Sequence, residues 1–160
     1  MTGRTIIIGG IVASLVLAMW EMVVEALIPG GAGFFGPPVA IGATIVRDLQ
    51  GSGNPIPVEP LALVLGLAGH MMNSVVLAAI FGALVARSSL ATVGLVVGGI
   101  VWGGAIFLAM WSAILPAIDP LMLSLNGPAF LLGHVMWGAA LGLLWAAVRP
   151  VREAGSLRPA

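Results

Sequence analysis

The chain contains no cysteine, no lysine and no tyrosine. Without cysteine it can form no disulfide, no thiolate metal site and no cysteine nucleophile. Without lysine it can use neither Schiff-base chemistry nor the phosphate-binding lysine of a P-loop. Its six basic residues are therefore all arginines.

Charge is also scarce. Only 8% of the 160 residues are charged, 60% are hydrophobic, and the formal net charge is zero. Soluble domains carry roughly 25% charged residues, and a soluble fold of this length could not bury so much apolar surface. The composition therefore predicts a multi-pass membrane protein whose surroundings are the lipid bilayer. A net charge of zero gives no long-range attraction to nucleic acid.

Four apolar runs cover about residues 6–28, 61–86, 90–115 and 129–148. Each can cross the hydrocarbon core, because about 20 residues at a rise of 1.5 Å suffice. We therefore expect an all-α, integral membrane four-helix bundle that forms a single transmembrane domain over residues 1–160. The first run is longer than the roughly 7–15 apolar residues of a signal peptide, so a retained helix is expected. Pro29 and Pro116 are expected to end the first and third helices.

The longest polar interval is segment 30–60. Within it, residues 38–50 form either a short amphipathic helix lying on the membrane surface or an irregular loop. Pro38 suits the start of such a helix. The tail, residues 150–160, is polar and is expected to be frayed.

Arginine placement predicts the orientation. Arg47 falls on one side of the predicted helices, and the other arginines fall on the opposite side: Arg4, Arg87, Arg149, Arg152 and Arg158. The positive-inside rule then places both termini in the cytoplasm and segment 30–60 outside. The expected location is the bacterial inner membrane.

The two halves of the chain share short segments in the same order. Gly69-His70-x-Met72 recurs as Gly133-His134-x-Met136, and Ala18-Met19-Trp20 recurs as Ala109-Met110-Trp111. A duplication would give two tandem helical hairpins, a parallel pseudo-repeat with its axis along the membrane normal. The alternative is chance matching in a chain with so few residue types.

His70 and His134 are the only histidines, and each lies in an apolar run, as Glu21 and Glu25 do. Ionisable residues in such runs are costly and usually functional. Counted along the helices, these side chains lie at similar depths. We therefore expect a polar layer that contains Glu21, Glu25, His70, Asn73, Ser112 and His134.

Several kinds of site fit this layer. His70 and His134 could be the axial ligands of a haem b, or they could bind a transition metal together with Glu21 and Glu25. The glutamates could instead form a proton or ion path. The remaining alternative is that the histidines only hydrogen-bond across helices and stabilise packing.

The chain shows no motif with catalytic spacing, so no catalytic residue is assigned. The interpretation is a non-enzymatic binding or accessory component of the membrane. Binding of haem or a transition metal is one alternative, and transport or proton relay is the other.

Glycines at four-residue spacing indicate close helix packing. They are Gly94, Gly98, Gly99, Gly103, Gly138 and Gly142. The packing would lie within the chain or between subunits of a homo-oligomer or larger membrane complex. Tryptophans usually lie at the membrane interface, so Trp102, Trp111, Trp137 and Trp145 are expected to face lipid or the interface.

The segments Gly133-His134-Val135-Met136-Trp137-Gly138 and Gly69-His70-Met71-Met72-Asn73 carry a resemblance to a known family. The chain is similar to a family of short bacterial four-helix membrane proteins, a domain of unknown function with a His-x-x-x-Gly signature in helices 2 and 4. That family commonly has a Met-Thr step in helix 1, where this chain has Met19-Trp20. The resemblance implies the four-helix architecture and no reaction.

Overall fold

The computed structural model describes residues 3–148, and the predicted frayed tail, with Arg149, Arg152 and Arg158, lies outside the described residues. The described chain is helical and has no strand. Its long helices are α1 (Gly3–Leu27), α3 (Pro60–Val85), α4 (Thr92–Ala109) and α6 (Gly127–Val148), and its short ones are α2 (Gly36–Gly42) and α5 (Leu115–Ile118). Three single turns complete it: η1 (Arg47–Gly51), η2 (Met110–Ile114) and η3 (Pro120–Ser124).

Four segments of the described chain are long and apolar enough to cross a membrane. They are Gly3–Leu27, Pro60–Val85, Thr92–Ile118 and Gly127–Val148. They cover the four apolar runs of the sequence, with boundaries that differ by a few residues. The chain is therefore a multi-pass membrane protein by the length and composition of its helices.

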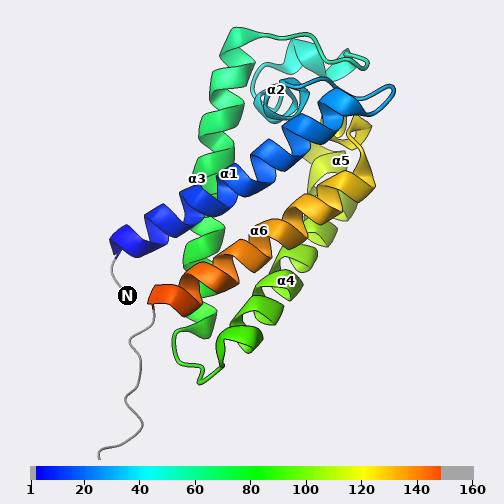
Figure 1. Cartoon of the computed structure of the whole chain (residues 1–160). Coiled ribbons are helices and arrows are strands. Elements are labelled where there is room, and N and C mark those ends of the chain that lie inside the picture. The colour runs from blue at the N-terminus through cyan, green and yellow to red at the C-terminus, as the bar shows by residue number, and fades with distance from the viewer. Residues whose placement is uncertain (1–2, 149–160) are drawn as a thin grey trace, which may run out of the picture.

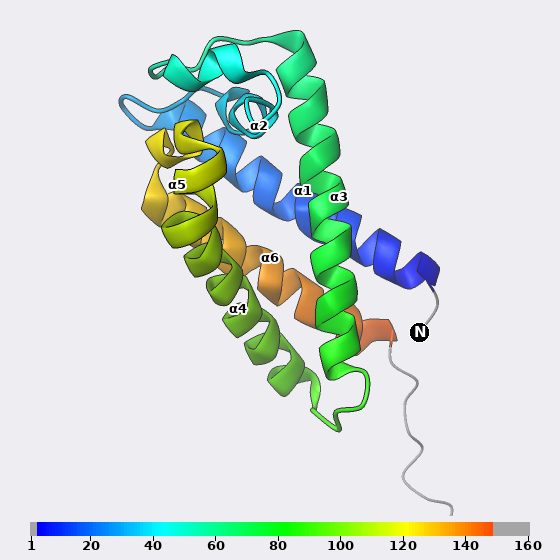
Figure 2. The same cartoon turned by 180° about the vertical axis from the view of Figure 1, so that it is seen from behind.

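The long helices form two layers (Figures 1 and 2). Helices α1 and α6 run side by side in opposite directions in one layer, and α3 and α4 form the other. Helix α1 packs on α3 and α6, and α4 packs on α6, whereas the consecutive helices α3 and α4 hardly touch. They are joined by residues 86–91 and diverge toward the end of the molecule that holds α2. We call this end the α2 end; the described termini, Gly3 and Val148, lie at the opposite end.

Helix α2 differs from the predicted surface helix at residues 38–50. It is shorter, six of its seven residues are buried, and it packs against α3. Glycines explain the close approach: a Cβ added at Gly66 of α3 would lie 2.8 Å from the carbonyl carbon of Pro38, and one added at Gly42 would lie 2.6 Å from the Cα of Ala62. The segment therefore closes the α2 end as part of the core, and only the turn η1, which has no buried residue, remains of the predicted surface helix.

Pro116 does not end the third span, contrary to the sequence prediction. The chain widens into the π-helical turn η2 and continues as α5 to Ile118. A proline removes one backbone N–H and its ring crowds the preceding turn of an α-helix. A wider turn directly before Pro116 relieves that crowding, so the span continues past the proline.

Four of the six predicted packing glycines form the contact between α4 and α6. A Cβ added at Gly99 would lie 2.9 Å from the carbonyl carbon of Gly138, and one added at Gly103 would lie 2.9 Å from that of His134. Gly138 and Gly142 face α4 in the same way. Gly98 has open space around it and Gly94 meets only the side chain of Leu90, so these two do not join α4 to α6.

Candidate functional site

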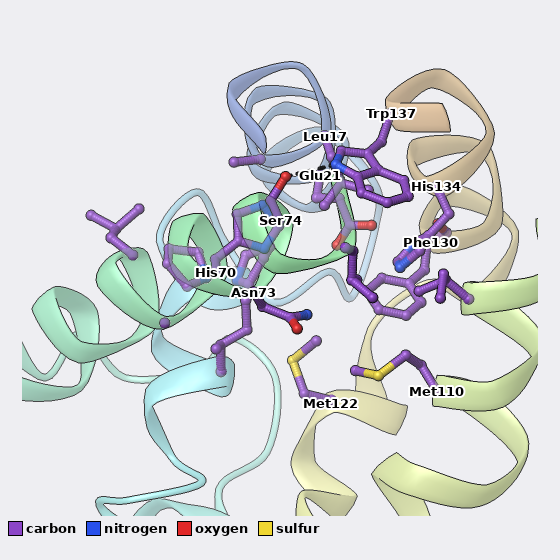
Figure 3. A pocket seen from close by; sticks show the side chains of 18 residues that line it. Leu17, Glu21, His70, Asn73, Ser74, Met110, Met122, Phe130, His134 and Trp137 are labelled. Carbon is purple, nitrogen blue, oxygen red and sulfur yellow. Dashed lines mark hydrogen bonds between the residues drawn. The ribbon is translucent and has the colours of Figure 1, made fainter. Parts of the chain in front are cut away.

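A cavity of about 120 Å³ lies between the two layers, near the α2 end. Helices α1 and α6 form one wall, α3 and the α4–η2 segment form the sides, and α2 and η3 close the top. The polar side chains that line it are Glu21, His70, Asn73, Ser74 and His134. Asn73 lines the cavity and is exposed, so it lies at the opening (Figure 3).

Glu21 is the least satisfied polar group of this cavity. Its residue is 4% exposed, and its Oε1 has no hydrogen-bond partner among the described residues. The oxygen lies over Gly133, where an added Cβ would be 3.1 Å from it, so the glycine leaves the space that the carboxyl group fills. No arginine lines the cavity. A buried carboxyl group without a hydrogen bond or counter-charge is costly and needs an explanation.

His134 holds a fixed orientation on the same wall as Glu21. Its Nδ1 lies 2.9 Å from the carbonyl oxygen of Phe130, and its ring packs on the rings of Phe130 and Phe107, with centroid distances of 4.5 and 6.0 Å. A carbonyl oxygen can only accept, so Nδ1 carries the hydrogen. In the neutral ring Nε2 then offers a lone pair, and it makes no hydrogen bond to any described residue.

His70 lines the same cavity from α3 (Figure 3). Its Nε2 lies 3.3 Å from the carbonyl oxygen of Ser14 in α1, so Nε2 donates and Nδ1 is the acceptor of the neutral ring. Below it, Trp137 Nε1 donates to Ser74 Oγ at 2.7 Å, and Ser74 Oγ donates to the carbonyl of Gly10 at 2.7 Å. These hydrogen bonds link α6, α3 and α1. They occupy the donors of Trp137 and Ser74, so neither can donate to a molecule in the cavity.

The cavity brings together four residues of the predicted polar layer: Glu21, His70, Asn73 and His134. It does not include Glu25 or Ser112. Ser112 is exposed on η2. Glu25 is 3% exposed, and its two oxygens accept hydrogen bonds from the backbone N–H of Ala32 at 2.8 Å and of Asn126 at 2.6 Å. Glu25 therefore joins two loops of the α2 end and is not part of the candidate site.

Several residues of the cavity were not expected from the sequence. Trp137 lines the cavity and is 3% exposed, so it belongs to the core and not to an interfacial belt; Trp145, outside the cavity, is also in the core at 5% exposed. Phe130, Met110 and Met122 form much of the apolar lining. The spacing of two polar lining residues did indicate their position. Trp137 follows His134 by three residues and Ser74 follows His70 by four, so each lies on the same helix face as the histidine before it.

The residues do not fit a metal or a haem. Within residues 3–148, no group of three or more His, Asp or Glu side chains is arranged to hold a metal ion. A cavity of about 150 Å³ accommodates benzene, and the cavity between the layers is of similar size at about 120 Å³. A haem macrocycle is several times larger than benzene, so His70 and His134 cannot bind it from opposite walls without separation of the helices.

A second polar cluster lies at the α2 end. Asp119 is 2% exposed, and its carboxylate accepts hydrogen bonds from Gln50 Nε2 at 2.6 Å and from Thr44 Oγ1 at 2.8 Å. Burial raises the pKa of the Asp119 carboxyl group, whereas the hydrogen bonds from Gln50 and Thr44 and the charge of Arg47 lower it. The cluster fixes η1 against η3, because Gln50 Oε1 also accepts from the backbone N–H of Leu121 at 3.1 Å.

The cavity is thus the strongest candidate for a functional site in the described chain, since it combines an unsatisfied carboxyl group, two oriented imidazoles and an opening. Function is inferred from this geometry alone. Comparison of the chain with models of protein families, with curated proteins and with solved structures finds no match.

Proposed function

We propose that this protein binds a small organic molecule in the cavity between its two helix layers. The observation that carries the proposal is the buried carboxyl group of Glu21, which faces the cavity and has no hydrogen-bond partner among the described residues. Native proteins rarely bury such a group without a partner. A ligand that bonds to Glu21 would supply the partner, and the predominantly apolar lining would bind the rest of the molecule.

The proposed setting is the bacterial inner membrane with both termini in the cytoplasm. Arg4 and Arg87 lie toward the end of the molecule opposite the α2 end, whereas Arg47 lies at the α2 end. This asymmetry supports the proposed orientation through the positive-inside rule. The cavity would then open in the half of the membrane nearer the outer surface.

The duplication into two hairpins remains a proposal. Its support is that His70 and His134, the residues of the recurring Gly-His segment, line one cavity from α3 and α6, which run in the same direction. An exact two-fold axis would exchange α1 with α4 and α3 with α6, so α3 would pack on α4 as closely as α6 packs on α1. Among the described helices, α3 and α4 hardly touch, so the arrangement is not an exact two-fold one. Membership of the short four-helix family likewise remains a prediction.

The geometry favours binding over a relay through both glutamates. Glu21 faces the cavity, but both oxygens of Glu25 are occupied by backbone N–H groups outside it. A proton path that needs both carboxyl groups therefore has only one available. A transport role that uses Glu21 alone would still begin with the binding step proposed above.

The test blocks the cavity without disturbing the helices. Gly69 lines the cavity and a Cβ added there meets nothing within 4 Å, so leucine can extend into the opening. Gly104 of α4 has equally open space but does not line the cavity, so Gly104→Leu is the matched control. Either substitution should stabilise its helix by somewhat less than the roughly 0.8–1 kcal/mol that separates glycine from alanine in helix propensity.

The measurement is the shift in unfolding temperature of the detergent-solubilised protein with a panel of small amines, alcohols and carboxylates. At ten times its Kd, a ligand stabilises the folded protein by about 1.4 kcal/mol. We expect at least one class to stabilise the wild type and Gly104→Leu, and to have no effect on Gly69→Leu. If no member of the panel stabilises the wild type, or if Gly69→Leu responds like Gly104→Leu, the cavity is not a binding site.

A further inference from the structure

We propose that the ligand of this cavity is a small protonated primary amine, bound through its ammonium group to Glu21, His134 and His70. This inference rests on the proposed binding function and adds the chemical class of the ligand. It follows from the hydrogen-bonding character, the charge and the size of the cavity.

The polar groups of the lining offer acceptors to a ligand. The Nδ1 of His134 donates to Phe130, and the Nε2 of His70 donates to Ser14, so each neutral ring presents its other nitrogen as an acceptor. The remaining donors of the inner wall are used: Trp137 donates to Ser74, and Ser74 donates to Gly10. When Glu21 is ionised, only the amide of Asn73, at the opening, can still donate. A primary ammonium group has three N–H donors and no acceptor, which complements this set.

The charge of the site points to the same class. An ionised Glu21 has no cationic side chain beside it among the lining residues. A buried charge is strongly destabilising unless a charge of opposite sign accompanies it. Phe130 and Trp137 also line the cavity, and the faces of aromatic rings attract cations within about 6 Å. An anionic ligand would meet the carboxylate and the lone pairs of both imidazoles, so the same lining disfavours it.

The site suits an organic cation more than a metal ion. Within the described chain, Glu21, His70 and His134 do not form a group that could hold a metal ion. They surround a cavity of about 120 Å³, which is close to the volume that accommodates benzene. An amine with about four to six carbon atoms fills this volume and places its apolar part against Met110 and Met122.

The experiment compares three probes of equal length: butylammonium chloride, 1-butanol and sodium butyrate at pH 7. Binding to the detergent-solubilised wild type is measured by calorimetric titration and by saturation-transfer NMR. The variants are Glu21→Gln, which keeps the shape of the side chain, and Gly69→Leu, which blocks the opening. Glu59→Gln is the matched control, because Glu59 caps α3 outside the cavity and a glutamine there can still accept a hydrogen bond from Ala62.

We expect butylammonium to bind at least tenfold more tightly than 1-butanol, and butyrate not to bind. Glu21→Gln should weaken butylammonium binding at least tenfold and change 1-butanol binding less than twofold, and Glu59→Gln should behave as the wild type. If 1-butanol or butyrate binds as tightly as butylammonium, the amine assignment is wrong, although a binding cavity remains.

If no probe binds, or if Gly69→Leu binds as the wild type does, the proposed binding function fails together with the amine assignment. The comparison of the three probes on the wild type needs no variant. It therefore decides the ligand class even if Glu21→Gln does not fold. Circular dichroism of each variant shows whether it has folded.

Discussion

The contact between α4 and α6 gives the sharpest stability prediction, because two neighbouring glycines differ completely in their surroundings. Gly99 faces α6, where an added Cβ would lie 2.9 Å from the carbonyl carbon of Gly138 and closer still to its oxygen. Gly98, the preceding residue, has nothing within 4 Å of such a Cβ. Gly99→Ala and Gly98→Ala therefore add the same methyl group to the same helix in opposite environments.

The geometry sets the magnitude. Ordinary contact begins near 3.4 Å, so Gly99→Ala must move the two backbones apart by at least 0.5 Å (3.4 minus 2.9) and further to clear the oxygen. Backbone atoms cannot rotate away as a side chain can. Overpacking of this kind typically costs about 1–3 kcal/mol, and separated helices also lose the van der Waals contacts that hold them in lipid. Gly98→Ala should instead gain about 0.8–1 kcal/mol of helix propensity.

Because the gain in helix propensity is common to both substitutions, we expect the two variants to differ by the overpacking cost of about 1–3 kcal/mol in the free energy of unfolding. The assay is reversible unfolding in mixed micelles of dodecyl maltoside and increasing SDS, followed by circular dichroism. Gly104→Ala, also in open space on α4, is a second control. Equal stabilities for Gly99→Ala and Gly98→Ala would refute the close approach of α4 and α6 at Gly99 and Gly138.

Two further predictions concern buried carboxyl groups. Glu25→Gln should destabilise the protein by about 1–3 kcal/mol, because the two oxygens of Glu25 accept from Ala32 and Asn126 and an amide group leaves one of these N–H groups unsatisfied. Glu21→Gln breaks no hydrogen bond, so it should cost less in the same SDS titration. A larger loss of stability for Glu21→Gln than for Glu25→Gln would contradict the assigned contacts. Burial raises the pKa of Asp119 in the folded protein above its ordinary value of 3.8, so the folded state holds this proton more tightly than the unfolded state does. The wild type should accordingly lose stability as the pH rises from about 3.8 through the raised pKa, whereas Asp119→Asn should lack this part of the decline. Parallel pH profiles of the two proteins would show that Asp119 does not titrate with a raised pKa.

Hydropathy was sufficient to predict the four long helices, because each apolar run is longer than the hydrocarbon core requires. It could not predict that α2 is buried, since a short segment with prolines and small residues reads as a surface loop until the backbone of α3 is beside it. Pro116 illustrates another limit. A proline usually ends a helix, and only the wider turn η2 allows this one to continue.

The candidate site was predicted in part for a physical reason. Depth along a helix follows from residue counting, so Glu21, His70 and His134 could be placed at similar heights. Counting gives no information about partners. Glu21 and Glu25 lie one turn apart, yet one faces a cavity and the other binds the backbone of two loops, because the loops return to α1 only near Glu25. The paths of these loops depend on contacts distant in sequence, which periodicity does not report.

The placement of α6 also has a consequence for synthesis. Helix α6 packs against both α1 and α4, whereas α3 and α4 hardly touch. Until α6 is translated, the first three long helices have no common partner. Helix α6 is therefore synthesised after the helices that it joins, so α4 can pack against the rest of the bundle only once α6 has been inserted. A nascent chain that stalls before α6 would leave the glycine face of α4 uncovered and the cavity without part of its wall.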